Sequence, residues 1–290
     1  MKLLHADADA GTLQLIRQGV LALALLVVAG MPAETLTAMP LWAYEPLGPF
    51  RLLPAGWWEV ILSFPFLVGL RITLAALLTA ALLLRPGGWW IAVTMAASWL
   101  LVFLLSLPRG FADFSHPELS LAILLLALPW FALADRLQAR CGRPSPPAHT
   151  LVPLTLLFLL TYVLPGVRRV FSMGAELFNP EHTWAWMTQH LHEAGALGPF
   201  DAAWLDASPL VRWSLAAGFP FITLLELLAP LALVSRPFRL VFLVAMLAFH
   251  AGSILLYRLY FLENMALLVL LLIAWGQGSA RRKPQPAAAR

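Results

Sequence analysis

The chain has 290 residues, of which 61% are hydrophobic and 12% are charged, and its formal net charge at pH 7 is +4. A soluble domain is about half apolar and about a quarter charged, so this composition excludes an ordinary soluble protein, a disordered chain and a small disulfide scaffold. The basic residues are scattered between apolar runs and form no stripe, which excludes nucleic acid as a partner. The single cysteine excludes internal disulfides and thiolate zinc sites. The sequence therefore indicates a membrane protein, with the lipid bilayer as its main partner.

Eight apolar segments could cross a bilayer core of about 30 Å as helices. In chain order they are residues 13–31, 60–84, 89–107, 119–134, 150–164, 209–234, 240–256 and 261–276. We expect an all-α, polytopic membrane helical bundle of about eight spans. It should form a single transmembrane domain over residues 1–280, followed by a disordered tail over residues 281–290.

Lysine and arginine concentrate on the cytoplasmic side of membrane proteins. With the N-terminus in the cytoplasm, twelve of the 19 basic residues lie on that side, six lie outside, and Arg71 lies within a span. The count favours both termini in the cytoplasm. The dominance of arginine over lysine fits a GC-rich bacterial genome, and we expect the protein in the bacterial inner membrane. The tryptophan pairs at Trp57 and Trp89 flank neighbouring spans and are typical of interfacial belts.

Two outer segments are long, residues 32–59 and 165–208. In the second, Asn179 can cap a helix that begins with Pro180 and runs to about residue 194. Its apolar residues, with Trp184 among them, share one face, and polar residues lie toward the other. The pattern predicts an interfacial amphipathic helix on the outer side.

Three ionisable residues stand out inside predicted spans: Arg71 and Glu226, each near the middle of its span, and His250. Such residues are costly in a bilayer and indicate a function by default. Arg71 and Glu226 at similar depth would pair, either as a structural pin between helices or as part of a working site. A neutral histidine bonded to a nearby carbonyl is the simpler interpretation of His250.

The outer histidines do not predict a metal site. His190 and His192 are two residues apart on a helix and therefore point in nearly opposite directions. His182 is two turns from His190, too far to share one ion without other ligands. We therefore expect no metal.

Four short motifs occur in order over roughly residues 150–275: a Tyr-x3-Gly-x-Arg-Arg segment, a tryptophan on a short helix, an acid within a span, and a Phe-His pair. The residues that carry them are Tyr162, Gly166, Arg168, Arg169, Trp184, Glu226, Phe249 and His250. This arrangement resembles the membrane part of the vitamin K-dependent gamma-carboxylase-like family, also called the horizontally transferred transmembrane domain. The resemblance implies an intramembrane pocket for a quinone-like isoprenoid or lipid. Its candidate residues are Arg71, Tyr162, Arg168, Arg169, Trp184, Glu226 and His250.

One departure limits what the resemblance implies. In that family the basic pair contains lysines, and a lysine amine is the proposed base that activates reduced vitamin K. Here the pair is Arg168 and Arg169, and a guanidinium, with a pKa above about 12, cannot act as that base. We therefore expect ligand binding without carboxylation, and whether the chain is an enzyme stays open.

Two other classes of function remain open. A small transporter or proton-relay protein would line a polar path with Arg71, Glu226 and His250, although helices broken by glycine at mid-span are not evident. A noncatalytic subunit of a membrane redox complex would need an apolar or aromatic outer surface for a membrane or periplasmic partner protein. The segment 32–59 could provide that surface.

Overall fold

The computed structural model describes residues 10–31, 36–46, 51–54, 56–109, 119–142, 148–179, 181–182, 208–257 and 261–280. Every regular element in these ranges is a helix, of the α or the 3₁₀ type, so the all-helical fold predicted from the sequence is confirmed there. The chain separates into two compact units. The N-terminal unit is Ala10–Pro146, and the C-terminal unit contains Pro147–Arg290.

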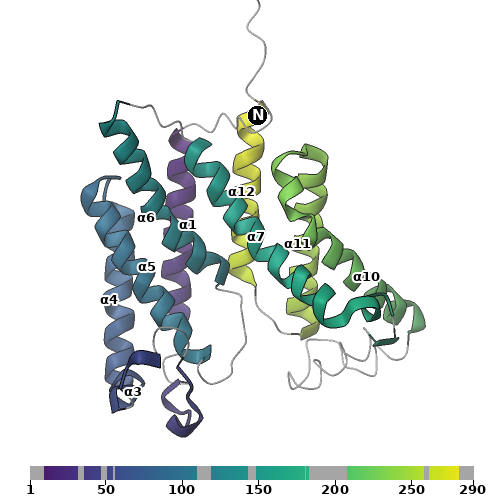
Figure 1. Ribbon diagram of the computed structural model, residues 1–290, viewed down its shortest axis with the longest axis horizontal. Coiled ribbons are helices and arrows are strands. Elements are labelled where there is room, and N and C mark those ends of the chain that lie inside the picture. Colours follow the sequence, from purple (N-terminus) through teal and green to yellow (C-terminus); the bar gives the residue numbers. More distant parts are fainter. Residues whose placement is uncertain are drawn as a thin grey trace, which may run out of the picture. The chain divides into compact units, whose positions relative to one another are not determined.

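Four long helices build the N-terminal unit: α1 (Ala10–Gly30), α4 (Phe64–Leu83), α5 (Gly88–Arg109) and α6 (Leu119–Arg140). Helix α1 packs on α4 and α6, and α5 packs on the same two helices, so the four close a bundle (Figure 1). Two short elements, η2 (Leu41–Ala43) and α3 (Gly56–Ile61), precede α4. Leucine repeats fill the interior, as Leu67, Leu70, Leu74 and Leu78 do from α4.

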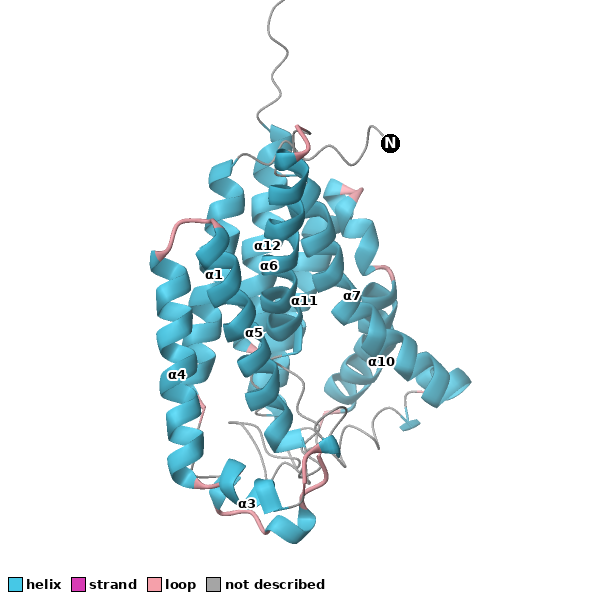
Figure 2. Ribbon diagram, turned by 60° about the vertical axis from the view of Figure 1, so that its left-hand side comes forward, coloured by secondary structure: helices cyan, strands magenta, loops and turns pink. Residues whose placement is uncertain are grey.

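The C-terminal unit contains α7 (Ala148–Met173), η4 (Gly174–Phe178), α10 (Pro209–Leu227), η5 (Ala229–Leu233), α11 (Arg236–Tyr257) and α12 (Leu262–Ala280). Helix α7 packs on α10 and on η5, and α11 packs on α12, η5 and α10 (Figure 2). The 3₁₀ segment η5 therefore lies between α7 and α11. This arrangement brings α7, α10 and α11 together, and these helices carry most of the candidate residues.

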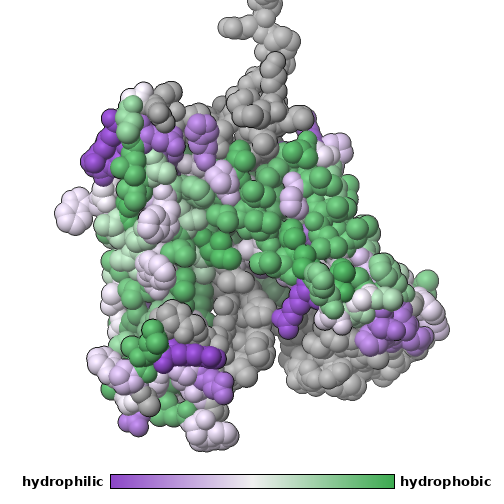
Figure 3. Space-filling model, viewed as in Figure 1, coloured by the Kyte–Doolittle hydropathy of each residue, from purple (hydrophilic) through white to green (hydrophobic). Residues whose placement is uncertain are grey.

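Six described helices are long and apolar enough to cross a membrane: Ala10–Gly30, Phe64–Leu83, Gly88–Pro108, Ser120–Arg140, His149–Phe178 and Arg236–Ile254. Two shorter apolar helices, Ala216–Leu227 and Leu262–Ile273, fall on the other two predicted spans. Large apolar side chains such as Leu26, Ile72 and Val244 are well exposed. Hydrophobic residues cover broad surfaces along the helices, while hydrophilic ones gather mainly near helix ends (Figure 3). Lipid would cover such surfaces in a membrane protein.

Two predicted spans were too long, and a proline explains each difference. The span expected from residue 60 begins instead at Phe64, after the extended Ser63, with a proline in its first turn. Proline is tolerated there because the first N–H groups of a helix have no internal partner. The span expected to reach residue 234 ends as an α-helix at Leu227. Pro230 has no N–H to donate to the carbonyl of Glu226, and the chain continues as the 3₁₀ segment η5.

A third predicted span was too short rather than too long. The span expected to end at residue 164 continues through Pro165 to Met173, as one helix of 26 residues. Apolar packed helices tolerate internal proline when neighbouring groups satisfy the freed carbonyl. Arg168 and Arg169 therefore lie on α7 and not in an outer segment. This change of position decides which partners they can reach.

The tryptophan pairs divide between surface and interior. Trp57 and Trp89 are exposed, while Trp58 and Trp90 are buried. Asn179 Oδ1 accepts the N–H of Glu181 at 3.1 Å, which is the capping bond expected of it. The predicted amphipathic helix beyond residue 182 lies outside the described residues.

Candidate functional site

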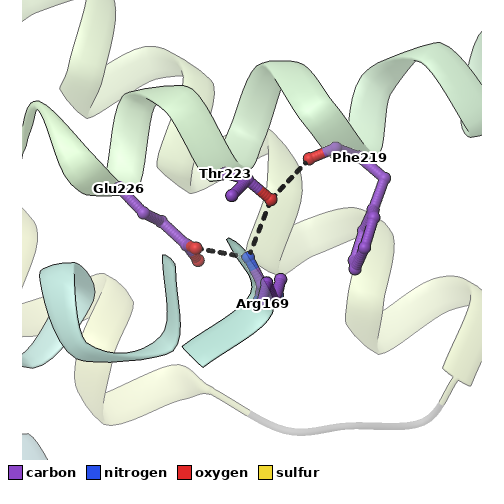
Figure 4. Close-up of polar contacts among 4 residues, drawn as sticks. All are labelled: Arg169, Phe219, Thr223 and Glu226. Atoms are coloured by element: carbon purple, nitrogen blue, oxygen red, sulfur yellow. Dashed lines mark hydrogen bonds and ion pairs between the residues drawn. The ribbon is translucent and has the colours of Figure 1, made fainter. Parts of the chain in front are cut away.

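An ion pair between Arg169 of α7 and Glu226 of α10 joins these two helices (Figure 4). Arg169 Nη1 donates to Glu226 Oε2, and the same nitrogen lies 3.5 Å from Thr223 Oγ1. The Glu226 side chain is only 4% exposed, and that of Arg169 is 21% exposed. A buried carboxylate is strongly destabilising unless a cation compensates its loss of water. Arg169 provides this compensation.

Three α10 residues present one face to the Arg169 guanidinium. Phe219, Thr223 and Glu226 are four and three residues apart, which places them on one side of a helix. Thr223 Oγ1 donates to the Phe219 carbonyl at 2.9 Å, and the Phe219 ring lies 4.9 Å from Arg169 Cζ, within cation–π range. The guanidinium is therefore held by a carboxylate, a hydroxyl and an aromatic ring.

Gly166 allows α7 and α10 to approach closely at this point. A Cβ atom placed on Gly166 would lie 3.2 Å from Glu226 Cβ and 3.3 Å from the side chain of Leu227. Small residues at helix crossings in membranes permit such approach. The glycine of the Tyr-x3-Gly-x-Arg-Arg motif therefore has a packing role directly beside the ion pair.

A second polar contact joins α7 to α11. The hydroxyl of Tyr162 and Nε2 of His250 lie 3.0 Å apart, and both residues are at most 5% exposed. The rings of Phe158 and Phe242 meet the Tyr162 ring edge-on at 5.4 and 5.6 Å, and the Phe261 ring lies 4.9 Å from the His250 ring. This is an uncharged hydrogen bond in an aromatic environment. The histidine bonds to a tyrosine rather than to the carbonyl that the sequence suggested.

The predicted pair between Arg71 and Glu226 is replaced by other partners, since Glu226 receives Arg169. Arg71 Nε and Nη2 donate to the carbonyls of Val28 and Ala29, at 3.2 and 2.9 Å. These carbonyls belong to the last turn of α1, where no helical N–H is available to them. Arg71 is the eighth residue of α4, which begins at Phe64. Arg71 caps a helix within the N-terminal unit.

Arg239 of α11 has the same kind of role in the C-terminal unit. Its Nε donates to the Ala232 carbonyl at 2.7 Å, and its Nη2 donates to that of Leu233 at 3.4 Å. Both acceptors lie at the end of η5. Arg239 was not among the candidate residues predicted from the sequence. The signal that could have indicated it is Pro230, which ends the α-helix and leaves carbonyls without helical donors shortly before an arginine.

The described contacts do not include the remaining candidate residues, Arg168 and Trp184. Arg168 is exposed, next to the partly buried Arg169, so only one member of the basic pair enters the contact with α10. Trp184 lies outside the described residues. The structure thus brings Tyr162 to His250 and Arg169 to Glu226, all in the C-terminal unit.

The N-terminal unit contains an ion pair that was not predicted. Arg17 of α1 lies 3.8 Å from Asp135 of α6, and its Cζ is 5.5 Å from the Trp90 ring of α5. The contact ties three helices of the bundle together near the start of α5. It explains why Trp90 is buried while Trp89 is exposed.

The described residues contain no group of three His, Cys, Asp or Glu side chains that could hold a metal ion. His182 Nδ1 lies 3.8 Å from Glu176 Oε2. Both side chains are more than half exposed. His190 and His192 lie outside the described residues.

Comparison with protein-family models, with curated proteins and with solved structures gave no match to this chain.

Proposed function

We propose that this chain is a multi-pass membrane protein whose C-terminal helices bind a hydrophobic ligand with a polar head, a quinone-like isoprenoid or a lipid. One observation carries the proposal. Tyr162, Arg169, Glu226 and His250 come from distant parts of the sequence and meet in two polar contacts on α7, α10 and α11. These are the positions that resemble the gamma-carboxylase-like membrane domain. A purely structural bundle does not need two buried polar contacts on one helix, which are costly inside a membrane.

The surroundings of these contacts favour an apolar ligand over an ion or a solute. Aromatic rings line the Tyr162–His250 contact, and the Glu226 charge is already compensated by Arg169. Ligand sites are mostly apolar, with a few polar groups that fix orientation. A transport path for ions would instead need charges accessible to water. The ligand-binding function is therefore better supported than the transporter or proton-relay alternative.

We propose binding without vitamin K-dependent carboxylation. The basic pair consists of arginines where that family has lysines, and the Arg169 guanidinium is occupied by Glu226. A group held as a buried cation by a carboxylate cannot also remove a proton from a substrate. Arg168 is exposed but is equally unable to lose its proton at physiological pH.

For the membrane arrangement we propose eight spans, both termini in the cytoplasm and the bacterial inner membrane as location. The two shorter apolar helices would complete the eight, with α10 extended by η5. Outside, residues 180–194 would form an interfacial amphipathic helix that covers the ligand. The support is the asymmetry of arginines along the sequence.

The direct test is mass spectrometry of lipids that remain bound after purification in detergent. We expect an isoprenoid or another specific lipid at close to one molecule per protein. The double variant Tyr162→Leu/His250→Leu should bind at least ten-fold less of this lipid per protein. The control Thr94→Val, a change at a buried position in the N-terminal unit, should bind as much as the unmodified protein. Lipid content equal in all three proteins, or no enrichment over an unrelated membrane protein, would contradict the proposal.

A second candidate function is a noncatalytic subunit of a membrane complex. Trp42 is 89% exposed, Leu52 is 86% exposed and Trp57 is 60% exposed, all in the segment expected to lie outside. The same segment borders a cleft of about 440 Å³ that is lined by Leu36, Met39 and Phe64, among others. Exposed aromatic surfaces of this kind are typical of interaction sites. Co-purification of another chain at equal stoichiometry, lost on Trp42→Ser/Trp57→Ser, would favour this function.

A further inference from the structure

Arginines gather at the end of the N-terminal unit where α4 connects to α5 and where α6 ends. Arg85 lies between α4 and α5, and Arg136 and Arg140 lie in the last two turns of α6. All three residues are exposed. Hydrophilic residues at this end stand next to hydrophobic surface along the same helices (Figure 3). The asymmetry of arginines along the sequence predicts that this end faces the cytoplasm.

Arg136 lies against the start of α5. A Cβ atom placed on Gly88, the first residue of α5, would lie 2.5 Å from Arg136 Nη1. The guanidinium therefore lies directly on the backbone at this point. Arg85 is three residues before Gly88, so their Cα atoms are at most about 11 Å apart. Arg85 and Arg136 thus flank the same short stretch of surface.

The described part of the chain offers these two arginines no carboxylate. Asp135, on α6 beside them, is already paired with an arginine of α1, and the first turn of α5 contains no acidic residue. Arg85 and Arg136 form no ion pair among the described residues. Asp7 and Asp9 lie outside the described residues, and both together would still leave this end with more basic than acidic residues.

The surface beside the arginines is apolar. Leu83 and Trp89, on either side of the connection between α4 and α5, are 82% and 80% exposed. A tryptophan exposed at the end of an apolar helix is typical of headgroup depth in a membrane, where the phosphates of phospholipids lie. The planar guanidinium of arginine matches phosphate oxygens in a bidentate hydrogen bond. A phospholipid fits both parts of this surface, whereas a free phosphate ion would use the arginines alone.

We propose that Arg85 and Arg136 bind the headgroup phosphate of an anionic phospholipid, whose acyl chains lie along Leu83 and Trp89. Basic groups between helices at the cytoplasmic side of a membrane attract such headgroups. A zwitterionic lipid carries a cation beside its phosphate, which the excess of positive charge at this end disfavours. The inference goes beyond the proposed function, because this site lies in the N-terminal unit and uses none of α7, α10 and α11.

The experiment compares two phospholipids that differ in headgroup charge. The full-length protein in neutral detergent is titrated with dioleoyl phosphatidylglycerol and with dioleoyl phosphatidylcholine, and bound lipid is counted by native mass spectrometry. We expect phosphatidylglycerol to bind more tightly by roughly ten-fold or more. Arg85→Gln/Arg136→Gln should remove this preference. The control Arg236→Gln/Arg281→Gln, which removes two other arginines expected in the cytoplasm, should retain it.

A second variant tests the site without removing an arginine. Gly88→Asp introduces a carboxylate beside Arg136 Nη1, and this carboxylate should occupy the guanidinium in place of the lipid. We expect it to remove the preference for phosphatidylglycerol without lowering the thermal stability of the protein in lipid-free detergent, because an acid in the first turn of a helix is favourable. This variant decides the inference even if Arg85→Gln/Arg136→Gln fails to fold.

Three results would overturn the inference. Equal affinity for the two lipids would show that headgroup charge is not recognised. Equal losses in Arg85→Gln/Arg136→Gln and in the control pair would show that only total charge matters. Displacement of phosphatidylglycerol by inorganic phosphate at an equal concentration would show that the apolar surface contributes nothing.

The proposed function can fail or stand separately. Tyr162→Leu/His250→Leu should leave the preference for phosphatidylglycerol unchanged, because these residues belong to the C-terminal unit. If the preference is absent while that double variant still loses a specific lipid, the proposed function stands and this inference fails. If the preference is present and no lipid depends on Tyr162 and His250, the reverse holds.

Discussion

Gly166 and Glu226 lie so close together that a Cβ atom on the glycine would be 3.2 Å from Cβ of the glutamate. The contact places the backbones of α7 and α10 near each other one turn before Arg169. Arg169 can then reach the carboxylate of Glu226 across a short gap. Close packing and charge pairing therefore depend on each other at this crossing.

Gly166→Leu should lower the free energy of unfolding by about 1–3 kcal/mol, because the added side chain overpacks the crossing of α7 and α10. Gly218→Leu is the matched control on α10, since nothing lies within 4 Å of its Cβ position. That change should be neutral or stabilise by up to about 1 kcal/mol through helix propensity. Thermal unfolding in detergent measures both, and equal effects of the two changes would show that the close approach is not needed.

The Arg169–Glu226 pair predicts strong coupling in a double-mutant cycle. Glu226→Gln alone or Arg169→Met alone should each lower the free energy of unfolding by about 3 kcal/mol, because each strands a charge in a largely buried place. The double variant should recover most of this loss. A coupling energy below about 0.5 kcal/mol would mean that the two side chains do not interact.

Arg71→Met is the control for that cycle. It removes the donors to the Val28 and Ala29 carbonyls and should lower the free energy of unfolding by about 1–3 kcal/mol. Combined with Glu226→Gln, the losses should add to within about 0.5 kcal/mol, since each residue has its own partner. Non-additive losses would show that Arg71 and Glu226 do interact, as the sequence suggested.

Topology can be tested with the natural cysteine. Cys141 is exposed at the end of α6, in the loop expected to be cytoplasmic. A membrane-impermeant maleimide should label it in inside-out vesicles and not in intact spheroplasts. In a Cys141→Ser background, His182→Cys should be labelled only in spheroplasts, because His182 is about half exposed on the expected outer side. Labelling of both positions from one side would overturn the arrangement.

We expect no carbon dioxide fixation when the purified protein receives reduced vitamin K, bicarbonate and a glutamate peptide. Arg169 is fixed to Glu226, and Lys2 and Lys283, the lysines of this sequence, are both expected in the cytoplasm, away from the outer segment. The measurement is incorporation of labelled bicarbonate, repeated with Arg168→Lys and Arg169→Lys. Fixation by the unmodified protein that disappears in His190→Ala would show that a histidine is the base and that the prediction is wrong.

The helical fold could be predicted because it depends on composition and on the length of apolar runs, which the sequence shows directly. The helix ends near prolines could not be predicted from the sequence. The prolines at 65, 165 and 230 look alike in sequence, yet one begins a helix, one lies within a helix and one follows a helix end. Which of these occurs depends on whether neighbouring groups satisfy the freed carbonyls, and that is a property of tertiary packing.

Four of the seven candidate residues make polar contacts with one another, but the sequence did not predict their pairing. Arg169, Glu226, Tyr162 and His250 were singled out as ionisable or motif residues, and all four make polar contacts in the C-terminal unit. The predicted partner of Glu226 was wrong because the sequence does not show which helices are neighbours: Arg71 bonds to α1, and Glu226 bonds to Arg169 of α7.

Tyr162, Gly166 and Arg169 follow one another on α7 at intervals of four and three residues, so they form a single line along the helix. The line is about 10 Å long, with the α11 contact at one end and the α10 contact at the other. Turning α7 by one residue, about 100°, would break both contacts at once. A ligand that binds beside Tyr162 and His250, as we propose, would therefore be mechanically linked to the ion pair, because α7 could not rotate to accommodate it without releasing Arg169 from Glu226.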